Sequence, residues 1–386
     1  MGKSVLAALA AAIIAFLPAA SLPSEDVFPG TEGTACIRCL AVGMDLFVTE
    51  QDTAPCSANN AEIMAALLTD CLPEGTQVTR RINGPGSVPE MEELIQETFR
   101  DAQETDTSFL YLSTHGVIWE EEGNTRMAWM LSDGTREEAL EPGALREMMD
   151  RIPGKKVLIL DCCHAGAAAE SFRGPEWRVL AGCGAEEDCY FWAAGEATGM
   201  GYFTSALENA LRAAGREQID PNGDGTVSLN ELAGRVREIY GISEALFWPE
   251  GDESPLFLLP EAEENSERIL DLRFDPAETK DGQISVSFHF RTDTTVRIEY
   301  RLIPMGPDGW EFDRAARLPD RERSGQRRGV LSPGGKDRTI RVSPDKLGAK
   351  GRALLQMISF RGLYGQVPVP EATWIVNGIQ ETKDDE

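Results

Sequence analysis

The sequence predicts an α/β domain with a mostly parallel sheet and helices on both faces, followed by a C-terminal antiparallel β-sandwich. Two observations predict this arrangement. Between about residues 35 and 260, short apolar runs alternate with segments of helical period. After a charged linker at 261–268, apolar and polar residues alternate with period two over 269–380, as in half-buried strands. A chain of 386 residues is long enough for both domains.

In the first domain, strands and helices are expected to alternate along the chain. The strands are predicted at 39–47, 76–82, 109–114, 157–160 and 178–183. Helices are predicted at 59–72, 87–99, 142–150 and 202–214, with a short Ala-rich helix after residue 164. The second of these helices begins with a capping box of Ser87 and Glu90. In the second domain, strands are predicted at 284–290, 296–303, 339–342 and 353–360.

Two strand ends of the first domain carry residues suited to catalysis. Ser113-Thr114-His115-Gly116 closes one apolar run, and Asp161-Cys162-Cys163-His164-Ala165-Gly166 closes another, so that His115 and Cys163 lie 48 positions apart. Open α/β sheets bind ligands at the carboxyl ends of their strands. A thiol and an imidazole placed there form a plausible nucleophile and base. The alternative, that both are core residues, is disfavoured by this spacing and placement.

With these two motifs the chain resembles the caspase-like cysteine peptidases, particularly the metacaspase and bacterial caspase-like branch, in the clan with clostripain. The segments 179–183 and 201–207 are similar to those that follow the nucleophile in that family, and the resemblance covers roughly residues 39–260. It implies a caspase-like fold and a cysteine-type endopeptidase in which Cys163 is the nucleophile and His115 the base. Neighbouring side chains at a strand end point to opposite faces, so Cys162 is expected to point away from His115.

Two further roles are expected near the nucleophile. The backbone N–H groups of Gly116 and Cys163 are candidate donors to an oxyanion, and a glycine at 116 allows the substrate carbonyl to approach closely. Asp161 lies on the same strand face as Cys163 and would pair with Arg or Lys at the cleavage position. The alternative is that Asp161 only caps a local backbone group. A second acidic contributor stays open among Glu186, Glu187 and Asp188.

Residues 220–231 fit the twelve-residue EF-hand loop, with oxygen-bearing side chains at the ligand positions and glycine at position six. Helix-forming sequence flanks this loop at 203–214 and 229–240. We therefore expect a Ca²⁺ site, in a structural or a regulatory role, and no organic cofactor. The expected ligands are Asp220, Asn222, Asp224, Thr226, Ser228 and Glu231.

The N-terminus and the charge indicate where the protein works. Lys3, an apolar run over 5–17 and the small residues before Ser21 follow the order of a secretory signal, which we place at 1–21. The run is shorter than the roughly 20 residues that span a bilayer, so we expect an exported protein, secreted or periplasmic, without stable membrane insertion. The first 264 residues carry a net charge of −28 and the remaining residues +1, which gives −27 for the whole chain. Such a surface disfavours nucleic acid and favours basic partners.

Eight cysteines in an exported chain suggest disulfide bonds. Because a nucleophilic thiol must stay free, we expect at most three bridges, with Cys183–Cys189 the first candidate. Cys36 and Cys39 are also close enough in sequence for a local bridge.

Taken together, the sequence predicts a secreted cysteine endopeptidase that hydrolyses peptide bonds after Arg or Lys through an acyl-enzyme. Its partners are then peptide or protein substrates with basic residues. Two alternatives stay open: a catalytically silent caspase-like binding or scaffold protein, and a thiol hydrolase acting on a non-protein amide or ester. The oligomeric state is not predicted.

Overall fold

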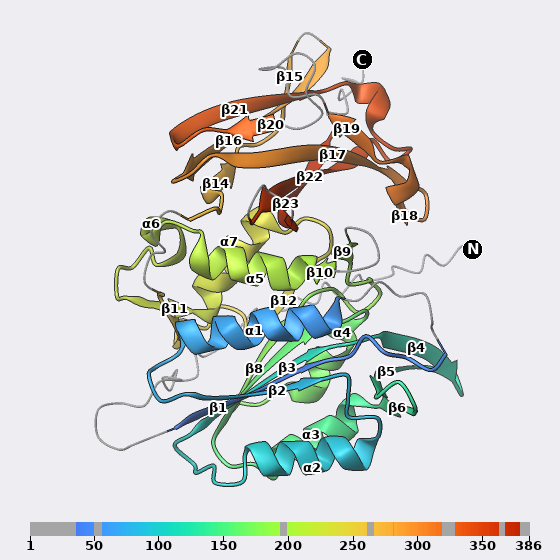
Figure 1. Ribbon diagram of the computed structural model, residues 1–386. Helices are drawn as coiled ribbons and strands as arrows, with labels where there is room; N and C mark the ends of the chain where they lie inside the picture. Colours follow the sequence, from blue (N-terminus) through green and yellow to red (C-terminus); the bar gives the residue numbers. More distant parts are fainter. Residues whose placement is uncertain are drawn as a thin grey trace, which may run out of the picture.

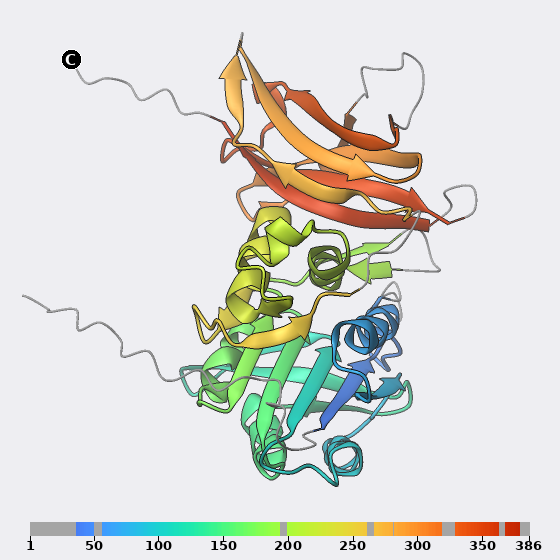
Figure 2. The same cartoon turned by 90° about the vertical axis from the view of Figure 1, so that its left-hand side faces the viewer.

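The computed structural model describes residues 36–49, 56–193, 199–260, 266–280, 282–318, 329–362 and 367–378. The predicted export signal and most of the predicted linker lie outside these residues. Figures 1 and 2 show an α/β part at the bottom, an antiparallel β part at the top, and helices α5 and α7 between them. Within the described residues, no helix has the length and apolar character needed to cross a membrane.

A six-stranded sheet with the order β12-β8-β7-β3-β1-β2 forms the centre of the α/β part. Neighbouring strands pair in parallel, except that β12 (Leu246–Trp248) runs antiparallel to β8. The parallel strands are β1 (Ile37–Gly43), β2 (Gln77–Ile82), β3 (Thr107–Ser113), β7 (Lys155–Asp161) and β8 (Trp177–Ala181). The predicted mostly parallel sheet is therefore confirmed.

Helices cover both faces of this sheet because the side chains of the central strands alternate between two cores. Phe109 and Tyr111 of β3 join one core, and Leu110 and Leu112 join the other. The first core is covered by α1 (Ser57–Cys71), α5 (Tyr202–Arg212) and α7 (Leu229–Ile239). The second is covered by α2 (Val88–Thr98) and α3 (Pro142–Asp150).

The start of α2 differs from expectation, and the segment after β3 contains strands that the sequence analysis did not predict. The Ser87 side chain makes no cap hydrogen bond. The Glu90 carboxylate instead accepts the Gly86 N–H at 3.0 Å and pairs with Arg136, so it does not complete a capping box. The polar segment after β3 forms a three-stranded antiparallel sheet of β4 (Gly116–Glu121), β5 (Asn124–Ser132) and β6 (Glu137–Leu140).

Short elements connect the main ones. A small antiparallel hairpin, β9 (Phe191–Ala193) and β10 (Gly199–Gly201), precedes α5. The short strand β11 (Thr226–Ser228) pairs with β13 (Pro255–Leu258). The remaining short helices are α4 (Ala165–Ala168), the 3-10 turn at Ala169–Phe172, and α6 (Arg216–Ile219).

The C-terminal part consists of two antiparallel sheets, which confirms the predicted antiparallel architecture. One sheet contains β14 (Leu270–Phe274), β15 (Glu278–Lys280), β16 (Gln283–Thr292) and β21 (Gly334–Val342). The other contains β17 (Val296–Gly306), β18 (Gly309–Trp310), β19 (Ala316–Leu318), β20 (Gly329–Leu331), β22 (Arg352–Arg361) and β23 (Val367–Asn377). Single 3-10 turns lie at Phe312–Arg314 and Pro344–Lys346.

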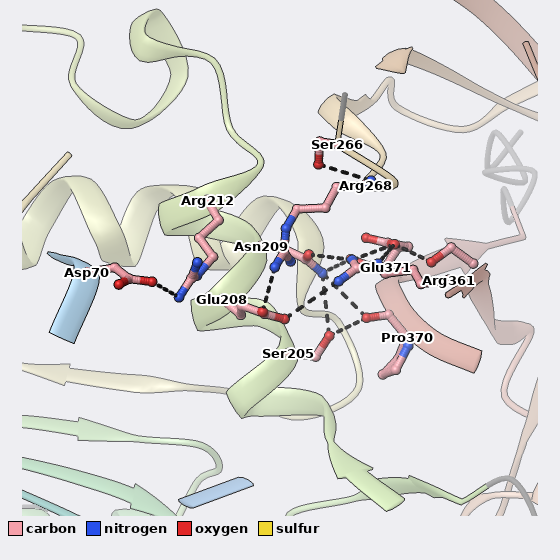
Figure 3. A network of polar contacts seen from close by, with 11 residues as sticks. Asp70, Ser205, Glu208, Asn209, Arg212, Ser266, Arg268, Arg361, Pro370 and Glu371 are labelled. Carbon is pink, nitrogen blue, oxygen red and sulfur yellow. Dashed lines mark hydrogen bonds and ion pairs between the residues drawn. The ribbon is translucent and has the colours of Figure 1, made fainter. Parts of the chain in front are cut away.

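The two parts share one hydrophobic core, which runs from the central sheet through α5 and α7 to the sandwich strands. Polar contacts reinforce this junction, and Figure 3 shows them between α5 and the end of the sandwich. The Asn209 amide donates to the Glu371 carbonyl at 3.0 Å, and the Arg361 guanidinium donates to the Asn209 side-chain carbonyl at 3.3 Å. The sandwich is therefore packed firmly on the helical layer.

The eight cysteines, all within the described residues, form no disulfide bond, so the expectation of disulfide bonds is wrong for this structure. Cys183 donates to the Cys162 carbonyl and Cys189 to Asp161, each at 3.3 Å, instead of bonding to one another. Cys36 and Cys39 lie along one extended segment, where three residues span about 10 Å. That exceeds the roughly 7 Å between Cα atoms that a disulfide can bridge.

Candidate active site

A pocket of about 120 Å³ opens at the carboxyl ends of the central strands. His115, Asp161 and Cys163 all line it. The strand register brings them together, because Ser113 at the end of β3 lies opposite Asp161 at the end of β7. The other walls come from the residues after β1, from the start of α1 and from the segment before α5; they include Asp45, Phe47, Asn60, Cys189, Tyr190 and Phe191.

The Cys163 thiol is half-buried against the segment before α5, with Sγ 3.8 Å from the Cys189 carbonyl oxygen. Burial raises the pKa of Cys163 to about 12. A thiol with that pKa is protonated near neutral pH, so it needs a base to remove its proton when it attacks. The His115 ring packs on Phe47 with 4.6 Å between ring centroids, which keeps the imidazole at the pocket wall.

Gly116 places the His-Gly motif directly against the Cys163 backbone. A Cβ atom at position 116 would lie 1.9 Å from the Cys163 carbonyl oxygen, well inside van der Waals contact. Only glycine therefore allows the two backbones to approach as closely as they do. The structure thus gives Gly116 a steric role beside the oxyanion role that the sequence suggests.

Replacement of Gly116 with Ala is expected to lower kcat about 100-fold, since displacement of the reacting groups by about 1 Å costs that much. Overpacking should also lower the free energy of unfolding by about 1–3 kcal/mol. Gly143→Ala is the matched control, because a Cβ at position 143 meets no atom within 4 Å. Steady-state kinetics and denaturant titration of both variants would measure these effects, and wild-type kcat in Gly116→Ala would contradict the steric role.

Cys162 and His164, on either side of Cys163, have different surroundings. Cys162 is 2% exposed and belongs to the core covered by α2 and α3. His164 has a φ of 58°, its N–H donates to the Glu187 carbonyl, and its ring Nδ1 lies 3.3 Å from the Ala185 carbonyl oxygen. His164 is also absent from the described pocket lining. Cys162 lines the pocket together with Cys163 and His115, but of the two thiols only that of Cys163 lies outside this core.

Asp161 is buried at the base of the pocket, and its two carboxylate oxygens have different surroundings. Oδ2 accepts the Thr204 N–H at 3.2 Å, the Thr204 hydroxyl at 2.5 Å and the Asn60 amide at 3.3 Å. Oδ1 accepts the weakly donating Cys189 thiol at 3.3 Å. Burial raises the pKa of Asp161, against the lowering effect of these donors. The carboxylate thus bonds a backbone group in α5 and also borders the pocket.

The second acidic residue of the pocket is Asp45, which the sequence analysis missed. Its Oδ1 accepts the N–H groups of Cys56 and Ser57 at 3.0 and 2.7 Å, and its side chain lines the pocket beyond β1. The three residues proposed for this role, Glu186, Glu187 and Asp188, are absent from the described lining. Because β1 pairs with β3, a carboxylate shortly after β1 reaches the same sheet edge, and this signal could have identified Asp45.

The expected calcium loop lies between α6 and α7, where its side chains bond to the loop itself. The Asp220 carboxylate accepts the N–H groups of Gly223 and Gly225 at 2.8 and 3.0 Å. Glu231 completes a capping box at the start of α7 by accepting the Ser228 N–H at 2.8 Å. Within the described part of the chain, no three His, Cys, Asp or Glu side chains converge as metal ligands.

The fold and the site define an α/β protein that carries a thiol and an imidazole at neighbouring ends of parallel strands. Comparison with known families identifies the family to which the chain belongs. Residues 37–244, just over half of the chain, match the caspase domain, and the chain belongs to that family. Family membership supports a cysteine-peptidase type of activity and protein substrates.

Comparisons with solved structures and curated sequences add little beyond the family. A protein from Geobacter sulfurreducens is 16% identical, with a TM-score of 0.43, over 58% of this chain and 99% of that one. Caspase-1 from Spodoptera frugiperda is 15% identical, with a TM-score of 0.35, over 52% of this chain and 75% of that one. No curated protein matches the chain.

Proposed function

We propose that this chain is an exported cysteine endopeptidase that hydrolyses peptide bonds after Arg or Lys. One observation carries the proposal: His115, Cys163 and Asp161, from two neighbouring strand ends, line a single pocket. His115 accepts the thiol proton as Cys163 Sγ attacks the peptide carbonyl, and the same proton passes to the leaving amine. Water then hydrolyses the thioester, which releases the acid product and regenerates the thiol. The backbone N–H groups of Gly116 and Cys163 would stabilise the oxyanion.

The charges of the pocket support the basic specificity. Asp161 and Asp45 both line it, and none of its described lining residues is Lys or Arg. A guanidinium or ammonium group would gain a charge-assisted hydrogen bond there. An acidic side chain would lose its hydration without gaining a counter-charge. The pocket chemistry therefore favours a basic residue over an acidic one at the cleavage position.

Hydrolysis of short fluorogenic peptides that end in Arg, Lys, Asp or Gln tests the proposal. We expect the mature protein to release fluorophore from the Arg and Lys peptides and to leave the Asp peptide intact. Preferential cleavage of the Asp peptide would reject the specificity. Failure to cleave any peptide or protein substrate would favour a silent binding protein, and turnover confined to non-protein amides or esters would favour a different thiol hydrolase.

The raised pKa of Cys163 predicts how the free enzyme reacts with iodoacetamide. Because the thiolate fraction grows until the pH reaches the pKa, the alkylation rate at Cys163 should rise about tenfold per pH unit from about pH 6 to about pH 9. Mass spectrometry of the modified peptide gives the rate, and Cys163→Ala provides the background from other thiols. A plateau near neutral pH would instead show a stable thiolate–imidazolium pair and contradict this prediction.

We also propose that the loop at 220–231 binds Ca²⁺, on the strength of its ligand pattern. Binding would require the Glu231 carboxylate to turn from Ser228 into the loop. Calorimetry should detect one site with Kd of about 10⁻⁴–10⁻³ M, as in extracellular modules. Asp224→Asn should weaken it at least about tenfold, since charge count sets affinity, while keeping an acceptor for the Thr226 N–H. Absence of heat at millimolar calcium would reject the site.

A further inference from the structure

One wall of the pocket is formed by a segment that touches both the nucleophile and Asp161. We call it the pocket hairpin; it comprises residues 189–193 and 199–202, with strands β9 and β10. Its first residue offers a carbonyl to the Cys163 thiol at 3.8 Å and its own thiol to Asp161 at 3.3 Å. Tyr190, Phe191 and Gly201 line the pocket. The position of this hairpin therefore determines the shape of the substrate site.

The pocket hairpin has little internal support. Each strand has three residues, and an isolated two-stranded hairpin is at best marginally stable in water. The Tyr202 N–H closes its base by donating to the Tyr190 carbonyl at 3.0 Å. The Phe191 side chain is 40% exposed, so burial of this ring contributes little to holding the hairpin. Contacts from outside supply the remaining restraint. Two come from α1, where the Asn59 amide donates to the Gly199 carbonyl at 2.8 Å and the Asn60 side-chain carbonyl accepts the Gly201 N–H at 2.7 Å.

The sandwich supplies three such contacts. The Phe312 ring packs on Tyr190 with 5.3 Å between centroids. The Arg301 guanidinium lies over the Trp192 ring, 4.4 Å from its centroid. At the base of the hairpin, the Gln356 amide donates to the Tyr202 hydroxyl.

Helix α5 fixes the sandwich relative to the pocket, so these contacts have a firm base. The Ser205 hydroxyl donates to the Pro370 carbonyl, and Asn209 bonds to the same strand, as Figure 3 shows. One residue before Ser205, Thr204 donates twice to Asp161. A single turn of α5 therefore both docks the sandwich and holds the carboxylate at the base of the pocket.

We propose that the sandwich is part of the substrate site, with Phe312 and Arg301 as positioning residues that hold the pocket hairpin in its binding shape. The inference rests on the proposed peptidase function. When the hairpin has its binding shape in only a fraction of the molecules, the apparent affinity for substrate is the intrinsic affinity multiplied by that fraction. Once the substrate is bound, Cys163 and His115 are in place as in the wild type. Loss of these contacts therefore raises KM more than it lowers kcat.

The experiment compares Phe312→Ala and Arg301→Ala with Arg338→Ala in the full chain. Arg338 lies over Phe290 within the sandwich, which makes it a matched control. Phe312 is 40% exposed, so its truncation removes little core. In Arg301→Ala the buried Glu299 carboxylate keeps Arg317 at 3.1 Å as a counter-ion. Thermal unfolding of each variant confirms that the fold is retained.

Two measurements are made on these proteins. Hydrogen exchange of the hairpin amides, including Tyr202 N–H, reports its opening without reference to activity. Kinetics with an Arg-ended peptide report KM and kcat. We expect faster hairpin exchange and a KM raised about three- to tenfold in both test variants. A fold-change of this size corresponds to the free energy that one aromatic or cation–π contact contributes. We expect kcat to stay within about twofold and Arg338→Ala to behave as wild type.

Each result decides between the proposals. Unchanged hairpin exchange in both test variants would overturn the positioning role. Faster exchange with unchanged KM would show that the hairpin does not shape substrate binding, which also overturns the inference. A wild-type protein without any hydrolytic activity would reject the proposed function separately, and the exchange rates would still show whether the sandwich holds the hairpin.

Discussion

Replacement of Cys163 with Ala is expected to lower peptide hydrolysis by at least about 1,000-fold, with the fold retained. The side chain is half-buried, and its removal takes away the only atom that can form the acyl-enzyme in the proposed reaction. Initial rates with an Arg-ended fluorogenic peptide measure the loss, and far-ultraviolet circular dichroism checks the fold.

The adjacent Cys162 offers a control of the same residue type. Its side chain is buried in the core on the α2 and α3 face, so Cys162→Ala should retain catalysis and lose a small amount of stability. The opposite result, with activity lost in Cys162→Ala and kept in Cys163→Ala, would reverse the assignment of the nucleophile.

Replacement of Asp161 with Asn should lower kcat/KM for Arg-ended peptides by about 100-fold or more, because it leaves a bound guanidinium without its counter-charge. The Asn carbonyl can still accept from Thr204, as Oδ2 does now, so α5 keeps its contact. Activity on a Gln-ended peptide should change much less. The ratio of the two kcat/KM values measures the specificity.

Glu186→Gln is the matched control, because Glu186 is exposed and absent from the described pocket lining. We expect it to keep the wild-type preference for Arg. An Asp161→Asn enzyme that still prefers Arg over Gln would show that another group, such as Asp45, selects the basic side chain.

The same carboxylate predicts a pH dependence of specificity. Burial raises the pKa of Asp161, so it gains its proton at a higher pH than an ordinary aspartic acid does. The preference for Arg over Gln should therefore fall as the pH is lowered, and the fall should begin at a higher pH than the usual Asp pKa of about 3.9 would give. KM for the two peptides, measured between neutral and acid pH, checks this direction.

Local patterns predicted most of the α/β part. Strand periodicity and the helical period of apolar residues are properties of a few consecutive residues, so they locate β3, β7, α1, α3 and α5 closely. They fail for the sheet of β4, β5 and β6, whose stability depends on pairing between strands. The capping box at Ser87 failed because a distant arginine, Arg136, holds Glu90.

The disulfide expectation failed for a related reason. The expectation was based on the number of cysteines and on the predicted export signal, whereas disulfide formation depends on the positions of the sulfur atoms in the fold. Cys39 and Cys71 are fully buried among apolar side chains, and Cys189 donates its thiol to Asp161. Sequence spacing contains none of this information.

The sequence by itself determined the fold class and the three central residues of the candidate site, because His115, Asp161 and Cys163 follow apolar strands whose ends meet at one sheet edge. Tertiary structure alone decided the rest. It brought Asp45 to the same pocket, made Gly116 a steric requirement and placed Phe312 and Arg301 of the sandwich against the pocket hairpin. These contacts join residues far apart in the chain, and local periodicity carries no signal for packing over such separations.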